Sequence, residues 1–246
     1  MDAKRIRYNR ITIGEKMLCI PLDHGYTNGP FDNLGNFVRL VSDIVEGGAS
    51  SIIVHKGMVK YLPNLKNTGL IIHLSGSTEF NKEVDKRIVC SVLEAVQYGA
   101  DAVSVHINVG NDFEQHMLQD AANISFQCKK YGMPLLAMMY VRNNDNITSF
   151  DIHHIIHTVR IATELGADIV KIPFPNDELA LQHIVKNSLV PIVVAGGGEI
   201  LGDEELRNKT KLIMENGAKG VCYGRNIIKS QNPRHTISLL KSTLIT

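Results

Sequence analysis

The residue best placed for covalent chemistry is Lys171, at the end of the apolar segment 167–171. Gly166 precedes this segment and Pro173 follows it, so the sequence predicts a short strand. Alternate side chains of a strand share a face, and a strand this apolar is typical of a parallel sheet buried on both sides. Burial disfavours an ammonium ion. We therefore expect a lowered pKa for Lys171 and a free amine able to attack a carbonyl carbon.

The alternative for Lys171 is a surface role, with the ammonium extended from the strand end into solvent. Other polar residues favour chemistry, because they gather at the ends of predicted strands and a hydrophobic core requires none of them. They are Asp23, His24, His55, Lys56, His73, His106, Tyr140, Arg142 and Arg225. Lys56 is the competing amine. It ranks second because the residue after His55 would point to the opposite face of its strand.

Apolar segments and helical patterns alternate along most of the chain. Strands are predicted at residues 16–22, 49–54, 69–74, 101–107, 134–140, 167–171, 190–195 and 220–223. Helices are predicted over 34–46, 83–98, 150–165, 177–186 and 201–216, with one ending near residue 131, a weaker pattern at 58–68 and further helices after residue 225. Eight such units predict an α/β fold, a single (β/α)8 TIM barrel over 1–246 with 1–14 as a polar lead-in. A doubly wound open sheet is the alternative.

Glycine clusters follow the seventh and eighth predicted strands, at 196–198 and at Gly224 before Arg225. In barrels these two loops bind phosphate through backbone N–H groups, and glycine permits the close approach. Arg225 would add a charge-assisted hydrogen bond. The alternative is a pair of tight strand-to-helix turns.

Composition excludes several classes of function. A net charge of +1 gives no electrostatic argument for binding nucleic acid or an anionic membrane. The four cysteines form no CxxC pair, and residues 1–7 lack the apolar core of a signal peptide, so we expect free thiols and a cytoplasmic protein. The strand-end histidines lack H-x-x-x-H or H-x-H spacing, so we expect no metal and no cofactor.

In chain order, these motifs resemble the class I (Schiff-base) aldolases of the archaeal fructose-bisphosphate aldolase type. The matching stretches are PLDHGYTNGP at 21–30, VHKG at 54–57, LIIHLSGST at 70–78, GADAVSVHINVG at 99–110, PLLAMMYVR at 134–142, GADIVK at 166–171, VPIVVAGGG at 190–198 and GRNI at 224–227. HINVG and AMMY resemble the heptulosonate synthase branch of this family. Tyr140-Val141-Arg142-Asn143 departs from the usual Tyr-Pro-Arg-Gly, and IPFP at 172–175 departs from the synthases.

The resemblance implies that Lys171 forms a Schiff base, with Asp23 as general acid/base and Tyr140 moving the hydroxyl proton. It implies substrate contacts from His24, Gly25, Tyr26, Thr27, Arg142, Gly196, Gly197, Gly224 and Arg225. The partners implied are a phosphorylated ketose and an aldehyde acceptor, aspartate semialdehyde, in a homo-oligomer. The roles of His55, Lys56, His73 and His106 stay open. Three alternatives remain: a fructose-bisphosphate aldolase, an autoinducer-2-phosphate thiolase using coenzyme A and His24, and a non-catalytic sugar-phosphate-binding barrel.

Overall fold

The computed structural model describes residues 2–29, 36–80, 84–149, 151–198 and 201–245. At its centre stand eight parallel strands: β1 (Met17–Pro21), β2 (Ser51–Val54), β3 (Gly69–His73), β6 (Ala102–Val109), β7 (Leu135–Arg142), β9 (Ile169–Ile172), β10 (Ile192–Ala195) and β11 (Gly220–Cys222). Each pairs with the next in this order, and β11 pairs with β1, so the sheet closes on itself. The predicted (β/α)8 barrel is confirmed.

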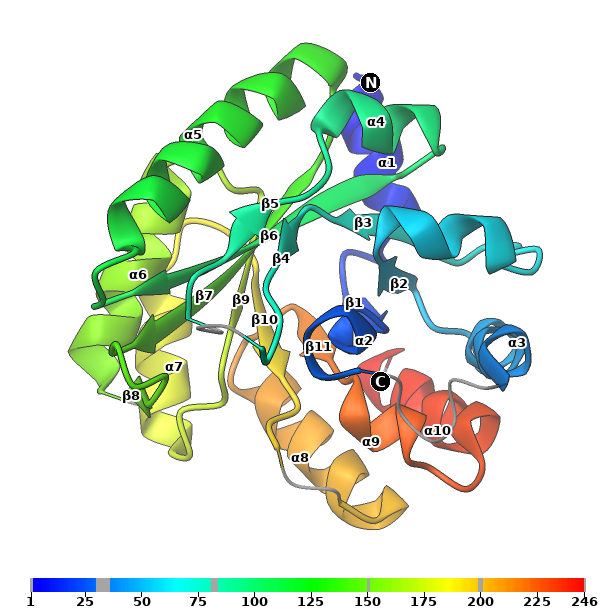
Figure 1. The fold of residues 1–246 in the computed structure, drawn as a ribbon. Coiled ribbons are helices and arrows are strands. Elements are labelled where there is room, and N and C mark those ends of the chain that lie inside the picture. The colour runs from blue at the N-terminus through cyan, green and yellow to red at the C-terminus, as the bar shows by residue number, and fades with distance from the viewer. Residues whose placement is uncertain (1, 30–35, 81–83, 150, 199–200, 246) are drawn as a thin grey trace.

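Helices surround the barrel in Figure 1. They are α3 (Phe37–Gly47), α4 (Val92–Gln97), α5 (Glu114–Tyr131), α6 (Ile152–Glu164), α7 (Glu178–Lys186), α8 (Asp203–Glu215), α9 (Arg225–Ile228) and α10 (Pro233–Ile245). Helix α3 illustrates their amphipathic pattern, since Phe37, Leu40, Val41 and Ile44 are all buried. None of the helices in the described ranges is long and apolar enough to cross a bilayer.

The core has two layers because strand side chains alternate between the barrel interior and the helices. Met17 and Cys19 on β1 belong to the inner cluster, whereas Leu18 and Ile20 belong to the outer one. The inner cluster also contains Ile71, Leu136, Met138, Ile169 and Cys222. The barrel interior is therefore filled with side chains, and its chemistry must lie at one of its two ends.

The helix predicted over 83–98 is wrong for most of its length. The short strands β4 (Ser75–Gly76) and β5 (Arg87–Ile88) form an antiparallel hairpin, and α4 begins only at Val92. Residues 81–83 lie outside the described ranges. Ser91 caps α4 by accepting a hydrogen bond from the Glu94 N–H at 3.1 Å, which sets the start of the helix. The weaker pattern at 58–68 is a 3-10 helix, η2 (Lys56–Tyr61).

Two further helices cover the ends of the barrel. In the lead-in, for which the sequence predicts no element, α1 (Ala3–Arg10) forms with Asp2 as its cap. Arg7 ties α1 to the end of α5 by donating to the Tyr131 carbonyl at 2.8 Å. At the other end, α2 (His24–Asn28) follows β1 after Leu22 and Asp23.

Candidate active site

Two cavities meet at Lys171 on the carboxyl ends of the strands. The first, about 350 Å³, is lined by Gly196, Gly197, Gly198, Lys209, Gly224 and Arg225, and is called the glycine cavity below. The second, about 470 Å³, is lined by Asp23, His55, His73, Lys86, His106 and others, and is called the histidine cavity. Both are also lined by His24, Tyr140, Arg142, Lys171 and Arg225. A substrate spanning the two would pass over the Lys171 amine.

Lys171 is buried, as predicted, with 7% of its surface exposed. Its Nζ lies 3.8 Å from the Met138 Sδ on the neighbouring strand and also interacts with the Cys222 thiol. The prediction of a lowered pKa is wrong. Burial does favour the neutral amine, but the electrostatic interactions with Cys222, Tyr140 and Asp23 outweigh it and raise the pKa of Lys171. The resting amine is therefore protonated, and a nearby base must remove that proton before attack.

Asp23 lies two residues beyond the end of β1 and is the carboxylate available as a base. It is the sole carboxylate lining either cavity among the described residues. Its Oδ1 lies 3.7 Å from the His24 Nδ1, and its Oδ2 lies 3.8 Å from the His73 Nε2. Burial opposes ionisation of this carboxyl group, but His24, His73 and Lys171 lower its pKa below the usual range. Asp23 is therefore ionised, with two imidazoles beside it.

His73 is held as a neutral ring at the end of β3. Its Nδ1 is 2.8 Å from the Ser104 Oγ, and the ring packs edge-on against His55 at 5.4 Å between centroids. Burial lowers the pKa of His73 to about 3, and the charge of Asp23 opposes this only in part. The ring is then a fixed neutral neighbour of Asp23 throughout the physiological range.

We expect the stability of the protein to fall on acidification because His73 cannot take up a proton while folded. The unfolded chain binds this proton near pH 6.5 and the folded chain only near pH 3, so stability is lost as pH falls between these values. The loss approaches about 1.4 kcal/mol per pH unit. Urea unfolding of the His73→Gln variant should depend less on pH than wild type between pH 6.5 and 4. The exposed His235→Gln serves as the control. Parallel pH profiles for wild type and His73→Gln would contradict the account.

Tyr140, on β7, stands between His106 and Arg142. The His106 ring stacks on it at 4.9 Å and 24° between planes, and the Arg142 guanidinium lies 4.8 Å from the centre of the phenol ring. Arg142 in turn donates to the Thr148 Oγ1 at 3.1 Å and to the Asn146 Oδ1 at 3.0 Å. The phenol is thus fixed by stacking, with a positive charge over its face.

Packing and backbone conformation explain why glycine occurs in the loops after β10 and β11. A Cβ on Gly224 would lie 2.3 Å from the His24 Cε1, so any side chain there would displace the imidazole. Gly197 adopts φ +84, which disfavours other residues, and its carbonyl accepts a 2.8 Å hydrogen bond from the Arg225 guanidinium. Lys209 donates to the Gly196 carbonyl at 3.4 Å. Two cations therefore flank an exposed glycine backbone.

The structure brings most of the predicted site residues together around these cavities. They are Asp23, His24, Thr27, Tyr140, Arg142, Lys171, Gly196, Gly197, Gly224 and Arg225. Gly25 and Tyr26 line neither cavity. The Tyr26 ring instead lies against His55, 4.6 Å between centroids. Lys56 is also outside, paired with Glu94 at 2.8 Å.

Several residues that line the cavities are not among the predicted site residues: Asn28, Ser75, Ser77, Lys86, Lys209 and Lys229. Ser75 and Ser77 follow the strand predicted at 69–74 but are neutral hydroxyls that the pattern of titratable groups does not include, whereas Asn28, Lys86, Lys209 and Lys229 lie away from the predicted strand ends. Among the described residues, no group of three or more histidine, cysteine or acidic side chains is arranged to hold a metal. The metal-free reaction stays a prediction.

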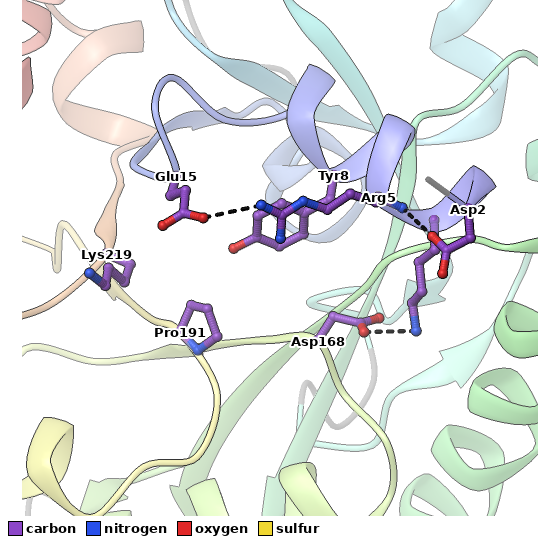
Figure 2. Close-up of a pocket in the computed structure, with 8 residues that line it drawn as sticks. Asp2, Arg5, Tyr8, Glu15, Asp168, Pro191 and Lys219 are labelled. Carbon is purple, nitrogen blue, oxygen red and sulfur yellow. Dashed lines mark hydrogen bonds and ion pairs between the residues drawn. The ribbon is translucent and has the colours of Figure 1, made fainter.

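A third hollow, about 400 Å³, lies at the amino ends of the strands (Figure 2). It is lined by Asp168, Pro191 and Lys219, which precede β9, β10 and β11, and by residues of α1. Four of its charged groups form ion pairs, with Lys4 2.7 Å from Asp168 and Arg5 3.2 Å from Glu15. Its two lysines are half-buried (Lys4) or exposed (Lys219), whereas Lys171 is buried in the barrel mouth. The carboxyl-end cavities are therefore the candidate active site.

Comparison with known proteins identifies the family of the chain. A family model described as DeoC/LacD family aldolase matches residues 17–230. The 2-amino-3,7-dideoxy-D-threo-hept-6-ulosonate synthase 1 of Archaeoglobus fulgidus is 39% identical over 236 residues, which cover 95% of this chain and 87% of the relative. The 2-amino-4,5-dihydroxy-6-oxo-7-(phosphonooxy)heptanoate synthase of Streptomyces griseus is 34% identical, over 89% of this chain and 81% of the relative.

Solved structures give the same result. An archaeal fructose-1,6-bisphosphate aldolase, with its catalytic lysine bound covalently to the carbinolamine intermediate, superposes with a TM-score of 0.88. It is 26% identical, and the match covers 100% of both chains. The similarity thus extends over the whole barrel, including the strand that carries Lys171.

Proposed function

The chain belongs to the DeoC/LacD family of aldolases and is a class I, Schiff-base-forming enzyme. From this premise we propose that it joins a phosphorylated ketose or triose donor to aspartate semialdehyde. The donor would react as an enamine on Lys171. The acceptor is suggested by the two synthases, whose products are seven-carbon amino compounds. The finding that carries the proposal is the position of Lys171 between two cavities of different character.

The glycine cavity suits the phosphate of the donor. Gly197, Gly198 and Gly224 line it without side chains, which leaves room for a phosphate, and Arg225 and Lys209 supply positive charge. A phosphate held between these groups would orient the donor carbonyl toward Lys171. His24, packed on Gly224, would form the wall between the phosphate and Asp23.

Schiff-base formation requires two proton transfers that Asp23 is suited to make. The Lys171 ammonium first gives a proton to the Asp23 carboxylate, and the free amine attacks the carbonyl carbon. Asp23 then returns the proton to the hydroxyl of the carbinolamine, which leaves as water. The raised pKa of Lys171 and the lowered pKa of Asp23 make the resting state an ammonium and a carboxylate, so the first proton transfer is uphill in the resting protein.

The iminium becomes an enamine when a bond next to it breaks: a ketose donor loses its aldehyde fragment as Tyr140 takes up the hydroxyl proton, and a triose donor loses an α proton to the Asp23 carboxylate. The enamine carbon then adds to the acceptor aldehyde, and the Tyr140 hydroxyl donates its proton to the developing alkoxide. Arg142 would stabilise the phenolate that remains, since its guanidinium lies 4.8 Å from the ring centre. In the cleavage direction the same proton moves back to Tyr140.

The purified protein should be mixed with each of several donors and aspartate semialdehyde, and the products identified by mass spectrometry. The donors are fructose 1,6-bisphosphate, dihydroxyacetone phosphate and other ketose phosphates. We expect a seven-carbon amino ketose from at least one pair. Cleavage of fructose 1,6-bisphosphate without use of aspartate semialdehyde would favour a fructose-bisphosphate aldolase instead. Turnover only with coenzyme A would favour the thiolase.

A further inference from the structure

One wall of the histidine cavity is made of residues that have no role in the reaction steps proposed above. It is made by the β4–β5 hairpin, in which Ser75 pairs with Ile88 and Gly76 with Arg87. The hairpin is attached to the barrel on both sides. The Ser75 Oγ accepts from the His106 N–H at 3.0 Å on β6, and the Val89 N–H donates to the Leu74 carbonyl at 2.8 Å. The wall is therefore a fixed part of the barrel mouth.

Lys86 is the charged residue of this wall. It is buried, with 8% of its surface exposed, and its ammonium donates a hydrogen bond to the Ser77 Oγ. Both residues line the histidine cavity. The Asn108 side-chain amide holds the backbone nearby by donating to the Val84 carbonyl at 2.8 Å. An ammonium and a hydroxyl thus stand together at a fixed place inside the cavity.

The charge of Lys86 reaches across the cavity. It contributes to the lowered pKa values of His55, His73 and His106. Because these rings are neutral, the fixed charges on the described lining are the cations Lys86, Arg142, Lys171, Arg225 and Lys229 and the single carboxylate Asp23. A cavity of this kind attracts an anionic ligand group.

The position of the hairpin indicates which part of a substrate carries this anionic group. An acceptor aldehyde must bring its carbonyl to the enamine on Lys171 and to Tyr140, both shared by the two cavities. If the donor phosphate fills the glycine cavity, the rest of the acceptor must extend into the histidine cavity. Its far end then meets Ser77 and Lys86.

We propose that Lys86, with Ser77, binds the acidic group of the acceptor aldehyde and determines which acceptors the enzyme accepts. This inference rests on the proposed function, because it takes the donor to be bound to Lys171. A carboxylate and a phosphate would both suit an ammonium and a hydroxyl. Acceptors of each kind therefore have to be compared.

The test measures steady-state kinetics of wild type and Lys86→Met with three acceptors at a saturating donor. The acceptors are aspartate semialdehyde, glyceraldehyde 3-phosphate and uncharged glyceraldehyde. We expect Lys86→Met to raise KM for the preferred anionic acceptor about 10- to 100-fold, the loss of one hydrogen bond to a charged group. The kcat/KM for glyceraldehyde should not change. The acceptor with the larger loss identifies the acidic group as carboxylate or phosphate.

Two controls separate this inference from general damage. Lys56→Met removes an amine of the same kind that pairs with Glu94 outside both cavities, and its kinetics should match wild type. Lys86→Arg retains the charge and should recover part of the KM. The yield of borohydride-trapped donor on Lys171 should be equal in wild type and Lys86→Met, which also shows that the variant is folded.

The outcomes are distinguishable. Equal losses of kcat/KM for charged and uncharged acceptors, or no loss for any, would overturn the role of Lys86 while leaving the Schiff base intact. Absence of a trapped donor in the wild type would overturn the proposed function itself, and this inference with it.

Discussion

Replacing Lys171 with methionine is expected to abolish the borohydride-stable adduct and to lower turnover by about 10³-fold or more. Methionine retains most of the length of the side chain but has no amine, so it can neither form a carbinolamine nor an iminium. The change places an apolar side chain next to Met138 in the inner cluster, which should accommodate it. Turnover is measured with the donor and acceptor pair preferred by the wild type.

Lys56→Met is the matched control for this prediction. The Lys56 amine lies just after β2 but pairs with Glu94 outside the cavities. Lys56→Met should therefore retain both the borohydride-stable adduct and the turnover of the wild type. Thermal unfolding of both variants checks that the barrel is intact. Full activity in Lys171→Met, with loss in Lys56→Met, would reverse the assignment of the two lysines.

Asp23→Asn is expected to lower turnover by about 10²- to 10⁴-fold, the usual contribution of a general acid/base. The amide has the shape of the carboxyl group but cannot accept the proton of the Lys171 ammonium. The variant also removes a negative charge that raises the pKa of Lys171, so more of the amine is free at rest. We therefore expect adduct formation to slow but not to disappear. Rapid-quench trapping with borohydride measures that rate.

Asp43→Asn, which changes a carboxylate on α3 outside the barrel, controls for the loss of one charge. The decisive comparison is between the rate of adduct formation and the overall turnover of Asp23→Asn, each relative to wild type. If Asp23→Asn forms the adduct at the wild-type rate and turns over normally, another group must move the proton, and His73 and His24 are its nearest imidazole neighbours.

The sequence was sufficient for the barrel and for most of the site because both depend on local patterns. Apolar segments followed by glycine or a polar residue marked the strand ends, and in a closed parallel barrel all such ends meet on one face. Asp23, His73, Tyr140 and Lys171 were found in this way. The lead-in helix α1 cannot be predicted in this way, because it is a polar surface helix without a buried apolar stripe.

The β4–β5 hairpin was missed for a physical reason. Val84, Ile88 and Val92 have helical spacing, but the segment is shaped by pairing with Ser75 and Gly76, ten or more residues earlier. Local spacing carries no information about that pairing. The spacing therefore predicts a helix at Lys86, and the place of this residue in the cavity cannot be predicted from the sequence.

The pKa of Lys171 was missed for a related reason. Burial can be predicted from the apolar strand around the lysine, and it does oppose the ammonium. The groups that outweigh it, Cys222, Tyr140 and Asp23, come from β11, from β7 and from the end of β1. Only the closed barrel brings them together, so the sign of the shift depends on tertiary structure.

The central claim is that Lys171 forms the Schiff base, and borohydride trapping tests it most directly. The protein is treated with borohydride and each ketose or triose phosphate in turn, then digested, and the modified peptide is sequenced by mass spectrometry. We predict a reduced adduct on Lys171 with at least one donor. An adduct on Lys56, or none with any donor, would contradict the account.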